Sequence, residues 1–371
     1  MSGPAERWLA VDGLRGIAAL GVVLFHLHPA PLFWLWSMVD LFFIISGLVI
    51  TAQLLRVSRL DGATLRIFWV RRALRIFPLY YALLLFTLAV GLLLHRLGLE
   101  GPPYGEGLWK YFVFLQFSEL YVPGMDAREA DLLRFFIPSW SIAVEEQYYL
   151  VWPLLLIALQ RRPQALVIVS LLLIAIGIGA RAGAVYPYVL PARLDGLAMG
   201  SLLAVWLDQR RTAAPPHPAL QRRVVQGLVL LGGLLLVLPY LWLGYVERQV
   251  LTLTDGAVVI SVTGFVLIYG LLIHSVIGPP GGRLARGLAR GLASAPLVWL
   301  GGLSYALYLS HTPLRGLYNG LLRSQGWPRS ELGDLLYLLV CIGFAWFCQR
   351  QIERRFNALK TRFPLPATAR G

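Results

Sequence analysis

The chain has 371 residues, of which 57% are hydrophobic, 12% are aromatic and only 14% are charged. Soluble domains carry roughly 25% charged residues, so this composition excludes a soluble globular protein and favours one that is embedded in lipid. The formal net charge of +14 does not indicate a nucleic-acid partner, because the basic residues form short clusters between apolar segments and no nucleic-acid recognition motif is present.

Apolar segments long enough to span a bilayer recur along almost the whole chain. A helix needs about 20 apolar residues to cross a hydrocarbon core of about 30 Å. The hydropathy pattern predicts ten such spans, near residues 14–34, 38–56, 76–97, 136–159, 164–182, 188–207, 224–243, 253–277, 296–314 and 333–350. The predicted fold is therefore an all-α integral membrane bundle of about ten transmembrane helices.

Two segments need separate interpretation. The first apolar run begins with Asp12 and Arg15 and ends at Pro29 without a small-residue cleavage pattern, so we expect a mature helix and not a signal peptide. The aromatic segment 108–117 is too short to span the membrane and is predicted to be interfacial or re-entrant.

The basic residues predict the orientation of the bundle. With the N-terminus in the cytoplasm, 23 of the 33 Lys and Arg residues lie on the cytoplasmic side, while the outer segment 98–135 carries several acidic residues. Cytoplasmic loops are enriched in Lys and Arg, so we expect both the N- and the C-terminus in the cytoplasm. The chain then divides into a membrane domain over residues 1–350 and a short basic cytoplasmic tail over residues 351–371.

The first span contains two ionisable residues, Arg15 and His26. Such groups are costly in lipid and tend to face the interior of a bundle. An interval of eleven residues turns a helix by about 20° beyond whole turns and raises it by about 16 Å, so both side chains project from one face. This spacing suits a donor whose phosphates stay in the cytoplasm while a long arm, such as the pantetheine of coenzyme A, reaches inward. The alternative is an arginine that extends to the interface and a histidine that bridges helices.

Carboxylates occur at a similar predicted depth. Glu145 and Glu146 lie about 12 Å below the outer end of the fourth span, near the level of His26. A buried carboxylate orients a neighbouring histidine and makes it more basic, as a general base for a hydroxyl requires. Adjacent helix residues diverge by about 100°, so only one of the two can face His26. Asp40, near the outer start of the second span, is the other candidate, and a helix-linking salt bridge is the alternative interpretation.

Further charged side chains gather at both ends of the predicted bundle. Arg193, Asp195 and His311 lie in the outer half, where an acceptor arriving from outside could be bound. A local ion pair between Arg193 and Asp195 is not expected, because residues two apart on a helix point apart.

Arg71, Arg72 and Arg75 form a cluster at the cytoplasmic start of the third span. Arginines bind phosphates through charge-assisted hydrogen bonds, so this cluster, together with Arg15, is the predicted site for the phosphates of coenzyme A. Positive-inside retention or the binding of anionic lipid is an equal alternative.

Other common catalytic signals are missing from the sequence. His26 and His28 diverge by about 200° on a helix, and no cysteine or carboxylate set completes them, so we expect no metal. No G-x-S-x-G, Walker or dinucleotide-binding motif occurs, and a covalent nucleophile is therefore not indicated.

Six blocks occur in order along the chain. They are Leu14-Arg15-Gly16 with His26, Asp40 to Gly47, Arg71 to Pro78, Ser139-Trp140-Ser141 leading to Glu145 through Tyr149, Arg193-Leu194-Asp195, and Leu303 to His311. Together they resemble the bacterial acyltransferase-3 family of membrane O-acyltransferases, from about residue 9 to about residue 350. The aromatic pair after the glutamate is usually Phe-Tyr in that family and is Tyr148-Tyr149 here.

The resemblance implies a location in the bacterial inner membrane and an acyl-coenzyme A donor, in the first place acetyl-coenzyme A. It implies a carbohydrate or glycolipid acceptor, such as sugars of lipopolysaccharide, exopolysaccharides, nodulation oligosaccharides or macrolides. It also carries functional roles onto Arg15, His26 and Glu145, while Tyr149 joins the candidate acceptor contacts. Some relatives add a periplasmic esterase-like domain, and we expect transfer here to be completed within the bundle or with a separate partner.

The predicted mechanism is direct attack on the thioester. His26, oriented by Glu145 or Asp40, takes the proton of the acceptor hydroxyl, while the arginines hold the phosphates of the donor. The alternatives are a transporter of a polar or acylated solute, a membrane glycosyltransferase with a lipid-phosphate donor, and a non-catalytic sensor or scaffold. The sequence leaves open the sugar, its hydroxyl, the acyl chain length and the oligomeric state.

Overall fold

The computed structural model describes residues 4–29, 31–99, 106–118, 134–159, 161–210, 227–228, 230–236, 256–278 and 283–366. All regular elements in these ranges are helical, which confirms the predicted all-α class. The α-helices are α1 (Pro4–Leu27), α2 (Met38–Arg56), α3 (Gly62–Arg96), α4 (Trp140–Ala158), α5 (Pro163–Ala182), α6 (Leu194–Arg210), α8 (Gly256–Ile277), α9 (Arg283–Leu292), α10 (Ala295–Gln325), α11 (Glu331–Cys348) and α12 (Arg354–Ala358). The shorter helical turns are η1 (Phe33–Ser37), η2 (Glu106–Val113), η4 (Arg134–Ser139), η5 (Leu190–Arg193), η6 (Gln349–Glu353) and η7 (Leu359–Arg362).

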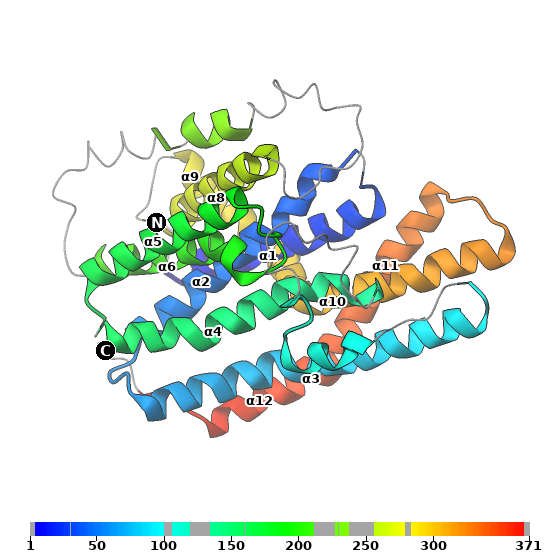
Figure 1. Cartoon of the computed structure of the whole chain (residues 1–371), viewed down its shortest axis with the longest axis horizontal. Coiled ribbons are helices and arrows are strands. Elements are labelled where there is room, and N and C mark those ends of the chain that lie inside the picture. Colours follow the sequence, from blue (N-terminus) through cyan, green and yellow to red (C-terminus); the bar gives the residue numbers. More distant parts are fainter. Residues whose placement is uncertain are drawn as a thin grey trace.

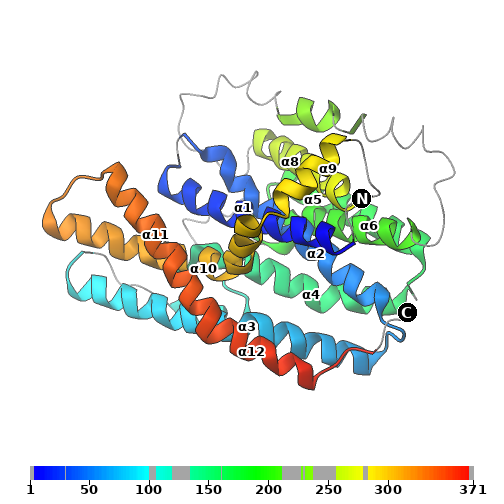
Figure 2. The ribbon, with the colours of Figure 1, turned by 180° about the vertical axis from the view of Figure 1, so that it is seen from behind.

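Long helices run side by side through the molecule (Figures 1 and 2). Within the described ranges, seven helices are long and apolar enough to cross a bilayer, or eight if α9 and α10, which meet at a bend of 58°, form one span. The predicted spans at 38–56 and 164–182 coincide with α2 and α5 to within a residue. The predicted seventh span, 224–243, lies mostly outside the described residues.

Helix α3 begins well before its predicted start. The loop expected over residues 56–75 is helical from Gly62, because Asp61 caps the helix. Its Oδ1 accepts hydrogen bonds from the backbone N–H and from the hydroxyl of Thr64, both at 2.9 Å. The arginines that were expected on a loop therefore project from a regular helix, so the helical period sets the direction of each.

Glycines allow the central helices to pack closely. A Cβ atom on Gly47 of α2 would lie 1.9 Å from the carbonyl oxygen of Leu197 in α6. A Cβ atom on Gly301 of α10 would lie 2.0 Å from the carbonyl oxygen of Asp12 in α1. Small residues at helix contacts are typical of membrane bundles, where close packing and not the hydrophobic effect holds helices together. These close contacts hold α2 against α6 and α1 against α10 in the centre of the bundle.

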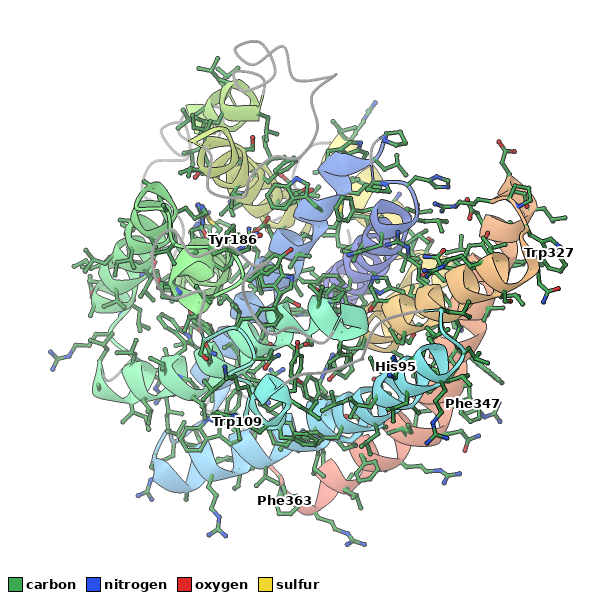
Figure 3. The ribbon with its side chains drawn as sticks, turned by 45° about the vertical axis from the view of Figure 1, so that its right-hand side comes forward. His95, Trp109, Tyr186, Trp327, Phe347 and Phe363 are labelled. Atoms are coloured by element: carbon green, nitrogen blue, oxygen red, sulfur yellow. The ribbon has the colours of Figure 1, made fainter. Side chains whose placement is uncertain are left out.

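Large apolar side chains cover the outside of the bundle. Leu172 of α5 is 57% exposed and Leu339 of α11 is 55% exposed. Figure 3 shows Trp327 and Phe347 at the periphery, pointing away from neighbouring helices. Since an exposed apolar surface is unfavourable in water and favourable in hydrocarbon, the structure is that of a multi-pass membrane protein.

Arginines of α1, α2 and α3 gather in one part of the bundle, which is called the basic end below. It contains Arg15, Arg56, Arg71, Arg72 and Arg75. After α11 the chain continues through η6, α12 and η7, and α12 lies beside α3 in both views (Figures 1 and 2). The boundary predicted at residue 350 thus falls inside a continuous helical segment that packs on α3.

Candidate active site

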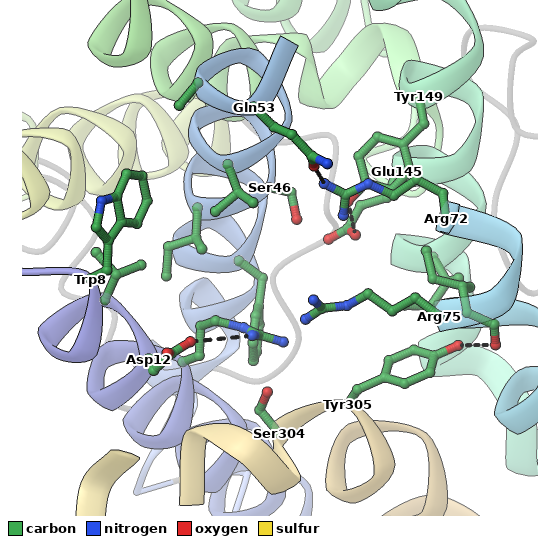
Figure 4. A pocket seen from close by; sticks show the side chains of 18 of the residues that line it. Trp8, Asp12, Ser46, Gln53, Arg72, Arg75, Glu145, Tyr149, Ser304 and Tyr305 are labelled. Carbon is green, nitrogen blue, oxygen red and sulfur yellow. Dashed lines mark hydrogen bonds and ion pairs between the residues drawn. The ribbon is translucent and has the colours of Figure 1, made fainter. Parts of the chain in front are cut away.

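A cavity of about 540 Å³ lies at the basic end, between α1, α2, α3, α4 and α10 (Figure 4). Its lining runs along α2 from Arg56 to Phe42, a rise of about 21 Å. The charged and amide side chains that line it are Asp12, Arg15, Gln53, Arg56, Arg72, Arg75 and Glu145. Four arginines against two carboxylates give the cavity a net positive lining, which favours an anionic ligand, and its length suits an elongated one.

Arg15 and Arg75 reach the cavity from different helices. The Nη1 atom of Arg15 lies 3.5 Å from Oδ1 of Asp12, one turn earlier on α1. Arg75 extends from α3 toward the middle of the cavity (Figure 4). The two like charges repel each other electrostatically, and Glu145 partly offsets the positive charge at Arg15. Two guanidinium groups that face one space in this way can hold a phosphate between them.

Arg72 belongs to a hydrogen-bonded group on the α2 and α4 side of the cavity. Its Nη2 atom donates to Oε1 of Gln53 at 3.2 Å, and its guanidinium lies 5.2 Å from the ring centre of Tyr149. The hydroxyl of Tyr149 donates to Oε2 of Glu145 at 2.7 Å. Glu145 therefore faces the cavity and is tied to Arg72 through Tyr149, as Figure 4 shows. Its neighbour Glu146 is absent from the described lining, in agreement with the expected divergence of adjacent residues.

Arg71 takes a different direction from Arg72 and Arg75. Its Nη1 atom donates to the backbone carbonyls of Lys360 at 2.8 Å and of Phe363 at 2.9 Å. The described lining of the cavity includes Arg72 and Arg75 but not Arg71. Of the three arginines predicted to bind phosphates, two line the cavity and one binds the C-terminal part of the chain.

His26 forms a pair with His311. Its Nδ1 atom lies 2.9 Å from the carbonyl oxygen of Val22 and 3.2 Å from Nε2 of His311. The Nδ1 atom of His311 lies 2.6 Å from the carbonyl oxygen of Tyr308. A carbonyl can only accept, so neutral His311 carries its proton on Nδ1, and its Nε2 accepts from the Nδ1–H of His26. This assignment leaves Nε2 of His26 with a free lone pair.

The histidine pair lies next to the cavity without lining it. The described lining includes Tyr308, whose ring centre is 6.1 Å from the ring of His311 and 5.8 Å from the ring of Phe42. The hydroxyl of Tyr308 donates to the carbonyl oxygen of Pro138 at 2.9 Å and accepts from Ser141 at 2.8 Å. Tyr308 is thus held in place between the arginine-lined cavity and the histidines.

The carboxylate expected beside His26 is bonded elsewhere in the described structure. Asp40 accepts a hydrogen bond at 2.7 Å from Arg193, and both side chains are 1% exposed. Glu145 bonds to Tyr149, as described above. The described hydrogen bonds of His26 go to Val22 and His311, so the partner that orients this histidine is a second histidine.

The prediction that Arg193 and Asp195 form no ion pair with each other is confirmed. Arg193 pairs with Asp40 and lies within about 5.5 Å of the rings of Trp36 and Trp140. Asp195 accepts two hydrogen bonds from Arg181, at 3.0 and 2.6 Å. These two buried ion pairs join separate helices of the bundle, and their side chains are outside the described lining of the cavity.

Several lining residues were not singled out from the sequence. Tyr308 belongs to the block that ends at His311, so its position was visible although its role was not. Trp8 and Arg56 line the cavity, and the Arg56 guanidinium lies 5.4 Å from the Trp8 ring. Leu365 and Pro366 line it from a segment predicted as a tail. Nothing in the local sequence indicates that these two residues return to the bundle.

Comparison with known proteins finds an acyltransferase family and several O-acetyltransferases. The sequence model of the Acyltransferase domain family, Acyl_transf_3, matches residues 8–349. The putative peptidoglycan O-acetyltransferase YrhL of Bacillus subtilis is 28% identical over 330 residues, which cover 82% of this chain and 48% of the relative. The peptidoglycan O-acetyltransferase OatA of Listeria monocytogenes is 27% identical over 326 residues, covering 82% and 49%. A putative O-acetyltransferase of Staphylococcus aureus is 27% identical over 330 residues, covering 81% and 49%. The chain spans about half the length of these relatives, and no solved structure matches it.

Proposed function

This chain belongs to the Acyltransferase domain family, acyltransferase-3, and from that membership we propose that it transfers an acyl group, in the first place acetyl, from acyl-coenzyme A to a saccharide hydroxyl. The observation that carries the proposal is the cavity at the basic end, into which Arg15, Arg72 and Arg75 project. By the positive-inside rule this end faces the cytoplasm, where acyl-coenzyme A is found.

The donor fits the cavity by charge and by shape. Its phosphates pair with the guanidinium groups of Arg15, Arg72 and Arg75 through charge-assisted hydrogen bonds. The neutral pantetheine arm extends from there toward Phe42 and Tyr308, along the apolar part of the lining. Tyr149 lies beside Arg72 in this cavity, so we assign it to the donor side and not to the acceptor.

The reaction proposed is direct transfer with His26 as general base. Nε2 of His26 takes the proton of the acceptor hydroxyl, the hydroxyl oxygen forms the new bond to the acyl carbon, and the carbon–sulfur bond breaks to release coenzyme A as a thiolate that then takes up a proton. Because Tyr308 lines the cavity and its ring is 6.1 Å from that of His311, the acyl end of the donor would pass this ring to reach His26. His311 acts as a positioning residue that keeps the proton of His26 on Nδ1.

The acceptor is proposed to be a sugar of a cell-surface glycan. The relatives from Bacillus subtilis and Listeria monocytogenes are named as peptidoglycan O-acetyltransferases, which makes a peptidoglycan sugar hydroxyl the first acceptor to test and lipopolysaccharide the second. Arg193 and Asp195, buried in ion pairs with Asp40 and Arg181, are better suited to holding helices together than to binding a sugar.

The test uses purified protein in lipid nanodiscs with labelled acetyl-coenzyme A and either peptidoglycan fragments or lipopolysaccharide. We expect a base-labile ester on the glycan, identified by mass spectrometry, and its loss in His26→Ala. His28→Ala is the matched control, because His28 directly follows the end of α1 but pairs with Asp334 at 3.2 Å. Full activity of His26→Ala would refute the role of His26 as general base. Solute uptake into proteoliposomes without ester formation would favour a transporter.

A further inference from the structure

The segment that follows α11 is part of the bundle. After Cys348 the chain runs through η6, α12 and η7 along α3, and it remains described as far as Pro366. Residues 359–366, called the C-terminal segment here, include the turn η7 and four residues beyond it. The family match ends at residue 349, so this segment lies outside the part of the chain that the family model covers.

Arg71 attaches this segment to α3. One nitrogen of its guanidinium donates to two backbone carbonyls of the segment, those of Lys360 and Phe363. The carbonyl oxygen of Lys360 also accepts from the backbone N–H of Phe363 at 3.1 Å, so Arg71 adds a charge-assisted bond to it and extends the attachment to the carbonyl of Phe363, one residue beyond the turn. Arg71 is therefore placed to hold the segment, while the other two arginines of its cluster remain turned to the cavity.

The far end of the segment forms part of the cavity. Leu365 and Pro366 line it together with residues of the basic end, among them Val57 and Arg72. The charge of Lys360 acts on Arg71, Arg72 and Arg75. The segment thus adds an apolar surface to the lining of the cavity and places one positive charge, that of Lys360, near the arginines.

We propose that the C-terminal segment is a wall of the donor site and that Arg71 positions this wall without touching the donor. This inference rests on the proposed function, because it takes the cavity to be the site of acyl-coenzyme A. The part of the donor nearest the basic end is its nucleotide, so the wall sets how tightly the nucleotide is held and leaves the chemistry at His26 unchanged.

The first experiment separates binding from chemistry. We expect Arg71→Gln to raise KM for acetyl-coenzyme A by about tenfold and to leave kcat within about twofold, since a factor of ten corresponds to loss of a few contacts. Arg66→Gln is the matched control, because Arg66 is an exposed arginine on the same helix outside the described cavity lining. Binding of coenzyme A to nanodisc-embedded protein, measured by calorimetry, should weaken by the same factor.

A double-mutant cycle decides whether Arg71 acts through the segment. The paired change Leu365→Ala with Pro366→Ala should also raise KM, and adding Arg71→Gln should raise it little further, because the wall is already lost. Effects that multiply would mean that Arg71 binds the donor directly and would overturn the proposal. An unchanged KM in both variants, or a fall in kcat alone, overturns it as well.

The outcomes also distinguish this proposal from the proposed function. If the wild-type protein neither binds coenzyme A nor transfers from acetyl-coenzyme A, the donor assignment fails, and with it the role of the wall. If wild type transfers and the variants keep its KM, only the wall is refuted. Size-exclusion profiles check folding, and should Arg71→Gln not fold, the paired change at Leu365 and Pro366 decides the question alone.

Discussion

The hydrogen bond between His26 and His311 predicts that changes at the two histidines reduce the rate by different amounts. Changing His311 to Phe preserves a ring of similar size but removes the nitrogen that accepts the hydrogen bond from His26, at 3.2 Å. A neutral hydrogen bond of this kind contributes about 1 kcal/mol net, which corresponds to about a fivefold change in rate. The loss is limited because the carbonyl oxygen of Val22, 2.9 Å away, still accepts from the same nitrogen.

Replacing His26 itself should cost much more. A positioned general base contributes about 10²- to 10⁴-fold, so His26→Ala should lose activity by that factor whereas His311→Phe loses about fivefold. His311→Gln should restore most of the rate, because its side-chain oxygen can accept from Nδ1–H of His26 as the imidazole did. The recovery by Gln separates positioning from a loss of packing.

The assay is kcat for transfer from acetyl-coenzyme A to the glycan, with the folded fraction of each variant measured by size exclusion. We expect kcat to fall in the order wild type, His311→Gln, His311→Phe and His26→Ala, with His26→Ala far below the other three. A loss in His311→Phe as large as that in His26→Ala would mean that His311 takes the proton, and the assignment of roles would be refuted. Equal activity of His311→Phe and wild type would refute the positioning role.

Three further predictions concern packing and charge. Gly47→Leu should abolish the folded bundle, because even a Cβ atom would lie 1.9 Å from the carbonyl oxygen of Leu197; thermal unfolding in detergent measures this. Arg193→Leu should destabilise the protein by about 3–5 kcal/mol through the unpaired Asp40, while KM for the acceptor in the remaining folded protein stays unchanged. Arg72→Gln should raise KM for acetyl-coenzyme A by about tenfold, with kcat nearly constant, as calorimetry with coenzyme A would confirm.

Control variants exist for two of these changes. Gly62→Ala serves for Gly47, since a Cβ at Gly62 has nothing within 4 Å. Arg59→Gln serves for Arg72, because Arg59 is exposed and pairs with Asp61 away from the described cavity lining. A raised acceptor KM in Arg193→Leu at normal stability would restore Arg193 to the acceptor site.

Arg71, Arg72 and Arg75 show which features of the site can be predicted from the sequence and which cannot. Their clustering predicted a site for the phosphates of the donor, which stays a prediction, and the structure places Arg72 and Arg75 on the lining of one cavity. The sequence did not show that α3 begins at Gly62 or that Arg71 binds the C-terminal segment. On a helix the side chains of Arg71 and Arg72 diverge by about 100°, and the packing of α3 against its neighbours decides which of them faces the cavity.

For the ionisable residues inside the bundle, part of the arrangement likewise follows from the sequence and the rest from the structure. Their spacing along each helix could be read from the chain, since a helix rises by a constant step per residue. Their partners could not: Asp40 pairs with Arg193, Asp195 with Arg181, and His26 with His311, and each of these contacts joins separate elements. The carboxylate expected beside His26 has other partners, since Glu145 lines the cavity and bonds to Tyr149.

The sequence by itself determined that this is an all-α membrane protein of the acyltransferase family, because hydropathy, charge bias and motif order are properties of short stretches of chain. Only the tertiary structure decided which arginines share a cavity, which histidine faces His26, and that Leu365 and Pro366 return to that cavity. Such contacts depend on how helices rotate and pack against each other, and close approaches at glycines such as Gly47 set that geometry across the whole bundle.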